Sequence, residues 1–205
     1  MTQISNIRYD VDSESHLEKW AKKINITHAG FVVPPPENNS QETIDELRKL
    51  SKITNNATER DVDRALLLDK SLGYDFGRIL DKYGLEFPKE EFNRLWGPVG
   101  DYIMYYKWLF NRPRPFQLME HHDIDIRVNT PSSAKTPAYP SGHTAYAVTA
   151  KIAIQRAYPV GNLEDELDRA VNNMALSRMI LGVHYPSDNA TSIGLVPRII
   201  EKLNL

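Results

Sequence analysis

Apolar residues recur at three- and four-residue spacing along almost the whole chain after residue 40. This spacing places apolar side chains on one face of an α-helix, whereas a half-buried strand needs alternating apolar and polar residues, which are scarce here. A chain patterned in this way buries its apolar surface by packing helices against one another. The pattern therefore predicts an all-α fold, a single-domain helical bundle.

The length of the chain limits it to one hydrophobic core. With 205 residues, of which 41% are hydrophobic, it can fill one core but is too short for two ordinary domains. We expect one domain, with residues 1–40 as an extended or irregular N-terminal segment and residues 41–205 as the helical part. The prolines of "VVPPPENNS", residues 32–40, favour extended backbone because a residue that precedes proline avoids the helical region.

Capping signals predict where the first long helices begin. Ser40 is placed to cap a helix over residues 41–53. Thr58 and Asp61 match a capping box, in which a hydroxyl and a carboxylate three residues apart bond to each other's backbone N–H groups. We expect this box to open one long helix over residues 59–83.

Proline and periodicity signals delimit the later helices. Pro88 suits a first helical turn, because its missing N–H has no partner there in any case. Residues 116–139 form a long polar connection, which is typical of a functional loop. We expect helices over residues 88–110, 142–157 and 163–181, and a last helix that starts near Ser187 with a bend at Gly194 and Pro197.

The charge of the chain argues against nucleic acid or an anionic membrane as a partner. Its 25 Lys and Arg residues against 27 Asp and Glu residues give a formal net charge of -2, so no broad field attracts anions. Affinity for a negative ligand must then come from a local cluster of cations. The chain has no cysteine, which excludes disulfides and thiolate metal sites.

The N-terminal sequence carries charged residues throughout and no apolar core of signal-peptide length. We therefore expect a cytoplasmic protein, or a periplasmic one if a leader was removed. The most apolar stretch, residues 95–110, is interrupted by Pro98, Asp101 and Lys107 and is shorter than a bilayer crossing requires. No transmembrane helix is expected.

The first motif is "KWLFNRPRP", in which Lys107 precedes Arg114 by seven residues. The two prolines break the helix, so the lysine lies in a last helical turn and the arginine on extended chain that can fold back towards it. Two cations brought together in this way would attract an anion. The alternative is a lysine that complements the helix dipole, followed by a stop signal.

The second motif is "AYPSGHTAY", residues 138–146, which leads into a predicted helix. Ser141 lies near the N-cap, and Gly142 allows close approach to the first helical amides, which lack partners and attract anions. His143 would stand beside a bound anion, where an imidazole can give or take a proton. The alternative is a capped helix start with a surface histidine.

The third motif is "SRMILGVHYPSD", residues 177–188. Gly182 is expected to end the helix, which frees His184 to turn back towards Arg178. Asp188 is four residues beyond this histidine, close enough to accept a proton from one ring nitrogen and fix its tautomer. The alternative is a plain helix end, a turn and the cap of the next helix.

Together the motifs resemble the three-part signature of the type-2 phosphatidic acid phosphatase superfamily. This superfamily includes bacterial class A non-specific acid phosphatases, membrane lipid phosphatases and vanadium-dependent haloperoxidases. The resemblance implies a helical bundle of the acid phosphatase and vanadium haloperoxidase type. The matching residues are Lys107 with Arg114-Pro115, Pro140-Ser141-Gly142-His143, and Ser177-Arg178 with His184 and Asp188.

Within the superfamily the chain most resembles the soluble class A acid phosphatases, over roughly residues 30–195. "VPPPENNSQETIDEL" is similar to their proline-rich entry to the first helix, and "YPSGHT" to their central motif. The chain departs from them at Pro137-Ala138, where that group usually has Gly-Ser. We also expect it to differ from them in lacking a secretory leader. Its "GVHYPSD" is nearer to the wider superfamily.

The resemblance implies a phosphatase that uses neither a metal ion nor a cofactor. Lys107, Arg114 and Arg178 would hold the phosphoryl oxygens, and Ser141 with the amide of Gly142 would complete the phosphate site. These cations would supply the charge that metal ions supply in other phosphatases. Vanadate, which has the shape and charge of phosphate, is expected to inhibit by binding to the same residues.

The resemblance also assigns the catalytic groups. His184 would attack phosphorus as a neutral imidazole and form a phosphohistidine, while Asp188 orients it. His143 would protonate the leaving oxygen and later deprotonate the hydrolytic water. Because His143 must start protonated and His184 neutral, we expect a bell-shaped pH profile on the acid side of neutrality.

Two other functions remain open at this point. A vanadium-dependent haloperoxidase would bind vanadate with the same residues, although such enzymes are usually much longer. A phosphate-binding protein without turnover would usually lack the nucleophile or the acid, whereas every matched position is filled here.

The segment "EHHDID" offers His121, His122, Asp123 and Asp125 as a conceivable metal site. Adjacent histidines cannot easily share one ion from a regular element, so we expect a solvated loop at the rim of the site. The expected partner is a small soluble phosphate ester such as a nucleotide or sugar phosphate, whose leaving group the loops would select, and pyrophosphate-type substrates stay open. The sequence leaves a homo-oligomer open.

Overall fold

Every regular element of the computed structural model is helical over the residues that it describes, which are 3–28, 30, 32–129, 131–159 and 161–205. The all-α prediction is therefore confirmed. The α-helices are α1 (Ser13–Ala21), α2 (Gln41–Asn56), α3 (Glu59–Lys70), α4 (Tyr74–Lys82), α5 (Lys89–Phe110), α6 (Pro115–Leu118), α7 (Gly142–Ala157), α8 (Glu164–Ile180) and α9 (Pro186–Lys202). Short 3-10 turns occur at Ile4–Asn6, Ile26–His28, Glu120–His122 and Gly161–Leu163.

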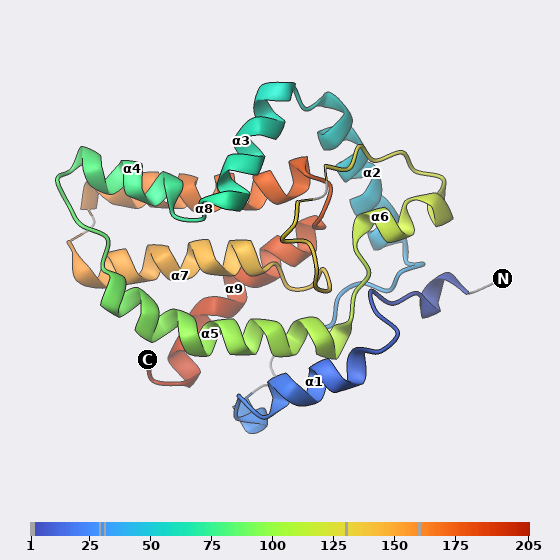
Figure 1. The fold of residues 1–205 in the computed structure, drawn as a ribbon, viewed down its shortest axis with the longest axis horizontal. Coiled ribbons are helices and arrows are strands. Elements are labelled where there is room, and N and C mark those ends of the chain that lie inside the picture. The colour runs from blue at the N-terminus through green and yellow to red at the C-terminus, as the bar shows by residue number, and fades with distance from the viewer. Residues whose placement is uncertain (1–2, 29, 31, 130, 160) are drawn as a thin grey trace.

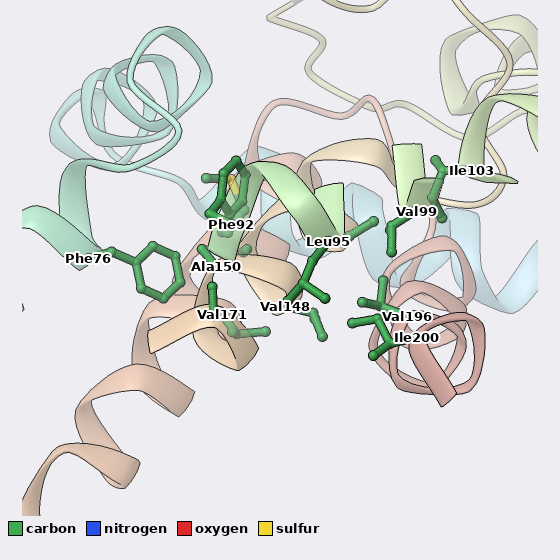
Figure 2. Packing of buried hydrophobic residues seen from close by; sticks show 14 of the residues in the cluster. Phe76, Phe92, Leu95, Val99, Ile103, Val148, Ala150, Val171, Val196 and Ile200 are labelled. Carbon is green, nitrogen blue, oxygen red and sulfur yellow. The ribbon is translucent and has the colours of Figure 1, made fainter. Parts of the chain in front are cut away.

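The main core lies among α5, α7, α8 and α9 (Figure 1). The central helix is α7, which packs against each of the other three. Leu95 and Val99, four residues apart on one face of α5, are fully buried in the same cluster as Val148 of α7 and Val196 of α9 (Figure 2). The sequence motifs lie at the ends of these helices.

The predicted caps are confirmed. The Ser40 side chain accepts a hydrogen bond from the Thr43 N–H, and α2 begins directly after it. Thr58 and Asp61 form both hydrogen bonds of the capping box at the start of α3. Pro88 is the N-cap of α5, and the bounds of α5, α7 and α8 lie within about two residues of those expected.

The prediction of one helix over residues 59–83 is wrong. Helix α3 ends at Lys70, and α4 begins at Tyr74 after a short turn. Ser71 leaves the helical region at φ -130° and ψ 73°, and Gly73 is the N-cap of α4. The turn redirects α4 so that Phe76 and Leu80 join the main core, and this burial outweighs the continuation of α3.

The N-terminal segment is more regular than its composition predicts. The structure contradicts an irregular segment over Ser13–Ala21, which forms α1. This helix packs along α5, with Leu17 and Trp20 partly buried against the main core (Figure 1). Their three-residue spacing is a helical signal that is too short to stand out in the sequence.

The described parts of the long connection, residues 116–129 and 131–139, are irregular apart from the end of α6, a 3-10 turn and hydrogen-bonded turns. Helix α9 continues through Gly194 and Pro197 to Lys202. None of the helices formed by the described residues is both long and apolar enough to span a bilayer.

Candidate functional site

The three motifs meet at one end of the bundle, where α5 and α8 end and α7 and α9 begin (Figure 1). Two helix N-termini therefore point their unpaired amides and positive dipole ends into the same region, which favours a bound anion. The motif residues gathered there are Lys107, Arg114, Ser141, Gly142, His143, Arg178, His184 and Asp188. Except for Gly142 and His143, which are partly exposed, all of them are buried.

A helix C-cap places His184. Gly182 has a positive φ of 70°, and its N–H bonds to the Met179 carbonyl while the Val183 N–H bonds to the Arg178 carbonyl. This pair of bonds is the Schellman motif, which ends a helix at a left-handed residue. The expected helix end at Gly182 is therefore confirmed, and the chain reverses so that His184 faces the cluster.

The imidazole of His184 has a defined orientation. Its Nδ1 lies 3.0 Å from Oδ2 of Asp188, which also accepts the Tyr185 N–H at 2.9 Å. With Nδ1 donating to the carboxylate, the lone pair lies on Nε2, which is 2.9 Å from Nη1 of Arg114. Burial, followed by the positive charges of Arg114 and Lys107, lowers the pKa of His184 well below its ordinary value. The ring is therefore neutral, with its lone pair directed at the cations.

Arg114 does fold back into the site, as its position after the helix stop predicts. Its Nε donates to the Thr136 carbonyl at 2.9 Å, and its Nη1 donates to the Val183 carbonyl at 2.7 Å. These backbone carbonyls come from the long loop and from the turn before α9. They hold the guanidinium against His184, and no carboxylate among the described residues pairs with it.

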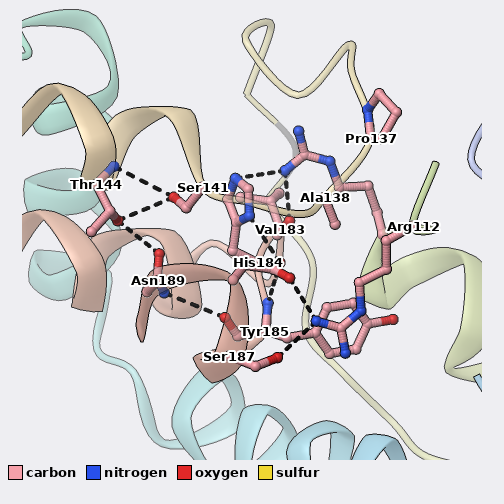
Figure 3. A network of polar contacts seen from close by, with 12 residues as sticks. Arg112, Pro137, Ala138, Ser141, Thr144, Val183, His184, Tyr185, Ser187 and Asn189 are labelled. Atoms are coloured by element: carbon pink, nitrogen blue, oxygen red, sulfur yellow. Dashed lines mark hydrogen bonds and ion pairs between the residues drawn. The ribbon is translucent and has the colours of Figure 1, made fainter. Parts of the chain in front are cut away.

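Lys107 is fully buried and has backbone partners. Its Nζ donates to the carbonyl of Pro137 at 2.6 Å and lies 3.4 Å from that of Ala138. Both residues, shown in Figure 3, are those at which the sequence departs from the class A pattern. Because the contacts are to carbonyls, which any residue supplies, the departure does not remove the partners of the lysine.

Ser141 is the N-cap of α7 rather than a free hydroxyl. Its Oγ accepts the Thr144 N–H at 3.4 Å and lies 3.1 Å from the Thr144 hydroxyl, which in turn bonds to Asn189 at 2.8 Å (Figure 3). A Cβ at Gly142 would lie 3.6 Å from Cε of Lys107. The glycine therefore keeps the helix start open beside the lysine.

A buried ion network that the sequence analysis missed supports Asp188. Arg112 donates to the Ser187 hydroxyl at 2.8 Å (Figure 3). It also donates to Oδ1 of Asp188 at 2.6 Å and to Glu46 of α2 at 2.8 Å. Its guanidinium lies 3.7 Å from the centre of the Tyr185 ring. Burial raises the pKa of Asp188, and the charge of Arg112 opposes this effect. The only sequence signal was an unassigned arginine inside "RPRP".

Asp69 of α3 was also missed, because no motif contains it. Its Oδ1 accepts from Nη1 of Arg178 at 2.7 Å and lies 3.1 Å from Nε2 of His143. Hydrogen bonds from His143, Ser133 and Arg178 lower the pKa of Asp69 despite its burial. This carboxylate therefore joins the histidine of the second motif to the arginine of the third.

His143 is neutral near pH 7 in this state of the site. Burial is the main cause that lowers its pKa to about 4, and the nearby Arg178 and Lys107 act in the same direction. The hydrogen bond to Asp69 acts in the opposite direction and raises the pKa. A negative charge placed among these cations would raise it further.

The cations of the site lack sufficient counter-charge. Burial lowers the pKa of Arg114 to about 10, and burial together with the charge of Arg114 lowers the pKa of Lys107. Nε of Arg178 is buried and has no hydrogen-bond partner among the described residues. A tetrahedral oxyanion would accept a hydrogen bond from this N–H and reduce the repulsion between the cations. The arrangement therefore suits phosphate or vanadate.

The "EHHDID" segment is occupied by structural contacts. Nε2 of His122 lies 2.8 Å from the Asn38 carbonyl, and Asn55 donates to the Asp125 carbonyl at 3.3 Å. Within the described ranges, no group of at least three His, Cys, Asp or Glu side chains is arranged to hold a metal ion.

Comparison with curated proteins finds phosphatases. A stretch of 91 residues is 37% identical to decaprenylphosphoryl-5-phosphoribose phosphatase of Mycobacterium tuberculosis strain H37Rv, covering 43% of this chain and 44% of that protein. The protein of the same name from Mycolicibacterium smegmatis is 38% identical over 85 residues, covering 42% of this chain and 41% of that protein. The matches thus span less than half of these relatives. No protein-family model matches the chain.

Comparison with solved structures supports the fold. A bacterial vanadium-dependent iodoperoxidase superposes with a TM-score of 0.64 at 17% identity, over 85% of this chain and 54% of that one. The helical bundle is therefore shared between the two proteins. The shared fold, the motif residues and the curated phosphatases that the chain is similar to all agree with the resemblance to the superfamily of type-2 phosphatidic acid phosphatases and vanadium haloperoxidases.

Proposed function

We propose that this protein hydrolyses phosphate monoesters through a phosphohistidine intermediate, without a metal ion. The observation that carries the proposal is the orientation of His184, whose Nδ1 faces Asp188 while its Nε2 faces Arg114. A neutral imidazole whose lone pair points at an anion site is the arrangement that attack on a phosphoryl group requires. The names of the curated relatives support hydrolysis of a phosphate ester.

The cations bind the phosphoryl group and neutralise its charge. Lys107, Arg114 and Arg178 are buried, so their charges act in a region of low dielectric, where each is stronger than in water. When the ester binds, Arg114 exchanges its contact with Nε2 of His184 for a phosphoryl oxygen. This exchange frees the lone pair for attack. The cations thus take the part that metal ions play in other phosphatases.

The reaction proceeds in two steps. The Nε2 lone pair of His184 forms a bond to phosphorus as the bond from phosphorus to the leaving oxygen breaks, and His143 gives that oxygen its proton. His143, now neutral, then takes a proton from water, whose oxygen attacks phosphorus and releases His184. Asp188 stabilises the positive charge on the phosphorylated imidazole.

The electrostatics favour activity at acid pH, as in an acid phosphatase. With a pKa of about 4, His143 is mostly neutral above pH 5 and must take up a proton as the ester binds. The negative phosphoryl group supports this uptake. We expect kcat/KM to fall as the pH rises above this range, and kcat to fall only at a higher pH, because the bound ester raises the pKa of His143.

The test is phosphate release from p-nitrophenyl phosphate, glycerol 3-phosphate and propyl phosphate in the presence of EDTA. We expect His184→Ala to lower kcat/KM for all esters by about 10³-fold or more. His143→Ala should lower the rate on propyl phosphate by about 10²-fold or more and affect p-nitrophenyl phosphate much less, because nitrophenolate leaves without a proton. His122→Ala, a histidine outside the cluster, is the matched control and should keep full activity.

Each failure has a distinct meaning. Full activity of the His184 variant would remove it as the nucleophile, and loss of activity with EDTA would contradict the metal-free reaction. Vanadate, a tetrahedral oxyanion, fits the same cations. Halide oxidation by the vanadate-loaded protein without ester hydrolysis would make it a haloperoxidase. Phosphate binding with no turnover of any ester would make it a binding protein.

A further inference from the structure

An apolar cavity opens beside the proposed proton donor. It has a volume of about 380 Å³ and lies between α5, the start of α7, Trp20 of α1 and Leu72 of the turn between α3 and α4. Gly142 and His143 line this cavity and also belong to the anion site. The volume is within the range of about 300–1,000 Å³ that small-molecule sites occupy.

The position of His143 decides which part of a substrate can enter the cavity. A group that protonates the leaving oxygen must lie next to that oxygen, so the carbon chain attached to it extends on the same side. The phosphoryl end is held by Lys107, Arg114 and Arg178, which are not among the residues that line the cavity. His143 contacts this cation cluster through Asp69, which also accepts from Arg178. The cavity is therefore placed to receive the alcohol half of the ester.

The walls of the cavity are built from packed aromatic rings. The rings of Trp96 and Tyr146 meet edge to face with their centres 5.3 Å apart. The ring of Phe92 also packs against that of Tyr146, with the two centres 4.8 Å apart. Ile103 and Met104 add aliphatic surface from the same face of α5. Rings held by other rings form a wall that keeps its shape without a ligand.

The lining offers little to a polar leaving group. The described residues that line it include no lysine or arginine and a single carboxylate, that of Asp101, which lies 3.4 Å from Nζ of Lys23. Sugar or nucleoside hydroxyls placed here would lose water without gaining enough partners, which is unfavourable. A hydrocarbon chain would instead replace water against aromatic and aliphatic surface, which is favourable.

We propose that the substrate is a phosphate monoester of an apolar alcohol, whose hydrocarbon chain occupies the cavity lined by Trp96, Tyr146 and His143. This inference rests on the proposed hydrolysis and names its substrate class. It differs from the nucleotide and sugar phosphates expected from the sequence. Two glycines of α5, Gly97 and Gly100, leave the room that the chain needs, because larger residues there would project into the cavity.

The test compares propyl, hexyl and decyl phosphate, whose leaving alcohols have nearly the same acidity, so that only the buried chain differs. A fully buried methylene can raise kcat/KM by up to about fourfold. We expect at least a tenfold rise from propyl to hexyl phosphate and a further rise with decyl. Glycerol 3-phosphate, which has the same three-carbon length as propyl phosphate plus two hydroxyls, should be the poorer substrate of the two.

Variants show whether the cavity causes the preference. A Cβ at Gly97 meets nothing within 4 Å, so Gly97→Leu should fill the cavity and bring the hexyl-to-propyl ratio of kcat/KM close to one. Met104→Gln, which adds an amide of similar length to the wall, should lower the same ratio. The control is Gly77→Leu on α4, another helical glycine with open space but outside the cavity, which should keep the parent ratio.

The outcomes separate this inference from the function on which it rests. Equal kcat/KM for all alkyl phosphates, or a preference for glycerol 3-phosphate over propyl phosphate, would overturn the apolar substrate and leave the phosphatase intact. A chain-length preference that survives both Gly97→Leu and Met104→Gln would place the hydrocarbon elsewhere and also overturn it. Absence of hydrolysis of any ester would overturn both proposals.

Discussion

Asp69 is the residue that links the proposed proton donor to the phosphate-binding cations. It accepts a hydrogen bond from His143 and another from Arg178. Its hydrogen bond raises the pKa of His143, while burial and the neighbouring cations lower it. Asp69 touches neither the nucleophile nor the leaving oxygen, so it acts as a positioning residue that favours the protonated form of His143.

Asp69→Asn should move the descending limb of the kcat profile to lower pH. The amide cannot stabilise a positive imidazole as the carboxylate does, so the pKa of His143 falls, by about one unit for a charged hydrogen bond of about 1.5 kcal/mol. The measurement is kcat between pH 4 and 8 on propyl phosphate. In Asp69→Glu, which keeps the charge, the descending limb of the kcat profile should lie closer to that of the parent than in Asp69→Asn. An unchanged limb in the amide variant would show that Asp69 does not tune His143.

The sequence revealed the site residues whose spacing within a motif brings them together, but not the roles of Asp69 and Arg112, which depend on contacts between distant segments. His184 and Asp188 are four residues apart, so their pairing follows from local geometry. Asp69 reaches the site from α3, and no local pattern records that contact. Arg112 stood inside a motif, but its bonds to Asp188 and Glu46 depend on how α2 packs, which spacing does not encode.

At the scale of the helices, the site forms where several helices begin or end. The turn at Gly182, directly after α8, decides where His184 lies, and the start of α9 decides where Asp188 lies. A Cβ at Gly182 would have the backbone oxygen of Arg127 and a side-chain carbon of Ile126 at 3.2 Å, and its φ is positive. Both the conformation and the space therefore require glycine at this turn.

Gly182→Ala should reduce both stability and activity. The left-handed conformation disfavours alanine by about 1–2 kcal/mol, and the contact with the loop that carries Arg127 adds to this. Gly84→Ala is the matched control, because Gly84 has a φ of 64° with nothing near its Cβ and lies after α4, outside the site. Urea unfolding should show a loss in both variants, while kcat/KM should fall only for Gly182→Ala. Equal activity of the two variants would contradict the positioning role of the turn.

The sequence predicts a helix end where a capping side chain marks it. It does not predict an end whose position depends on packing between distant segments. Ser40 and Thr58 carry capping groups, and the structure uses them as expected. The break between α3 and α4 has Gly73 as its only local signal, and the burial of Phe76 and Leu80 fixes it. The helix α1 was missed because nine residues give a weak periodic signal.

The molecule as a whole holds more positive charge at the site than it balances. The carboxylates of Glu46 and Asp188 form ion pairs with Arg112, and the carboxylate of Asp69 forms one with Arg178. Lys107 and Arg114 bond only to carbonyls and to His184 in the contacts that the described residues show. The folded protein therefore carries a cluster of positive charges that repel one another and destabilise it. A bound anion raises the free energy of unfolding, and the gain grows as more of the site is occupied.

The buried histidines make stability depend on pH. The pKa of His143 is about 4 in the folded protein and about 6.5 as an ordinary value, so the unfolded chain binds a proton first as the pH falls. Above pH 6.5 both states are neutral and this group contributes nothing. Between pH 6.5 and 4 the free energy of unfolding decreases, by up to about 3 kcal/mol from this residue. The lowered pKa of Asp69 acts only below about pH 4, outside this window.

His143→Gln should therefore flatten the pH dependence of stability. Glutamine does not titrate, so the variant should lose about 2 kcal/mol less than the parent between pH 7 and 4.5 in urea unfolding without phosphate. His121→Gln, an exposed histidine, serves as the control and should follow the parent. Orthophosphate should flatten the parent curve as well, because a bound anion raises the pKa of His143 towards its ordinary value. Parallel curves for the parent and His143→Gln would contradict a buried neutral imidazole and with it the acid optimum argued from that pKa.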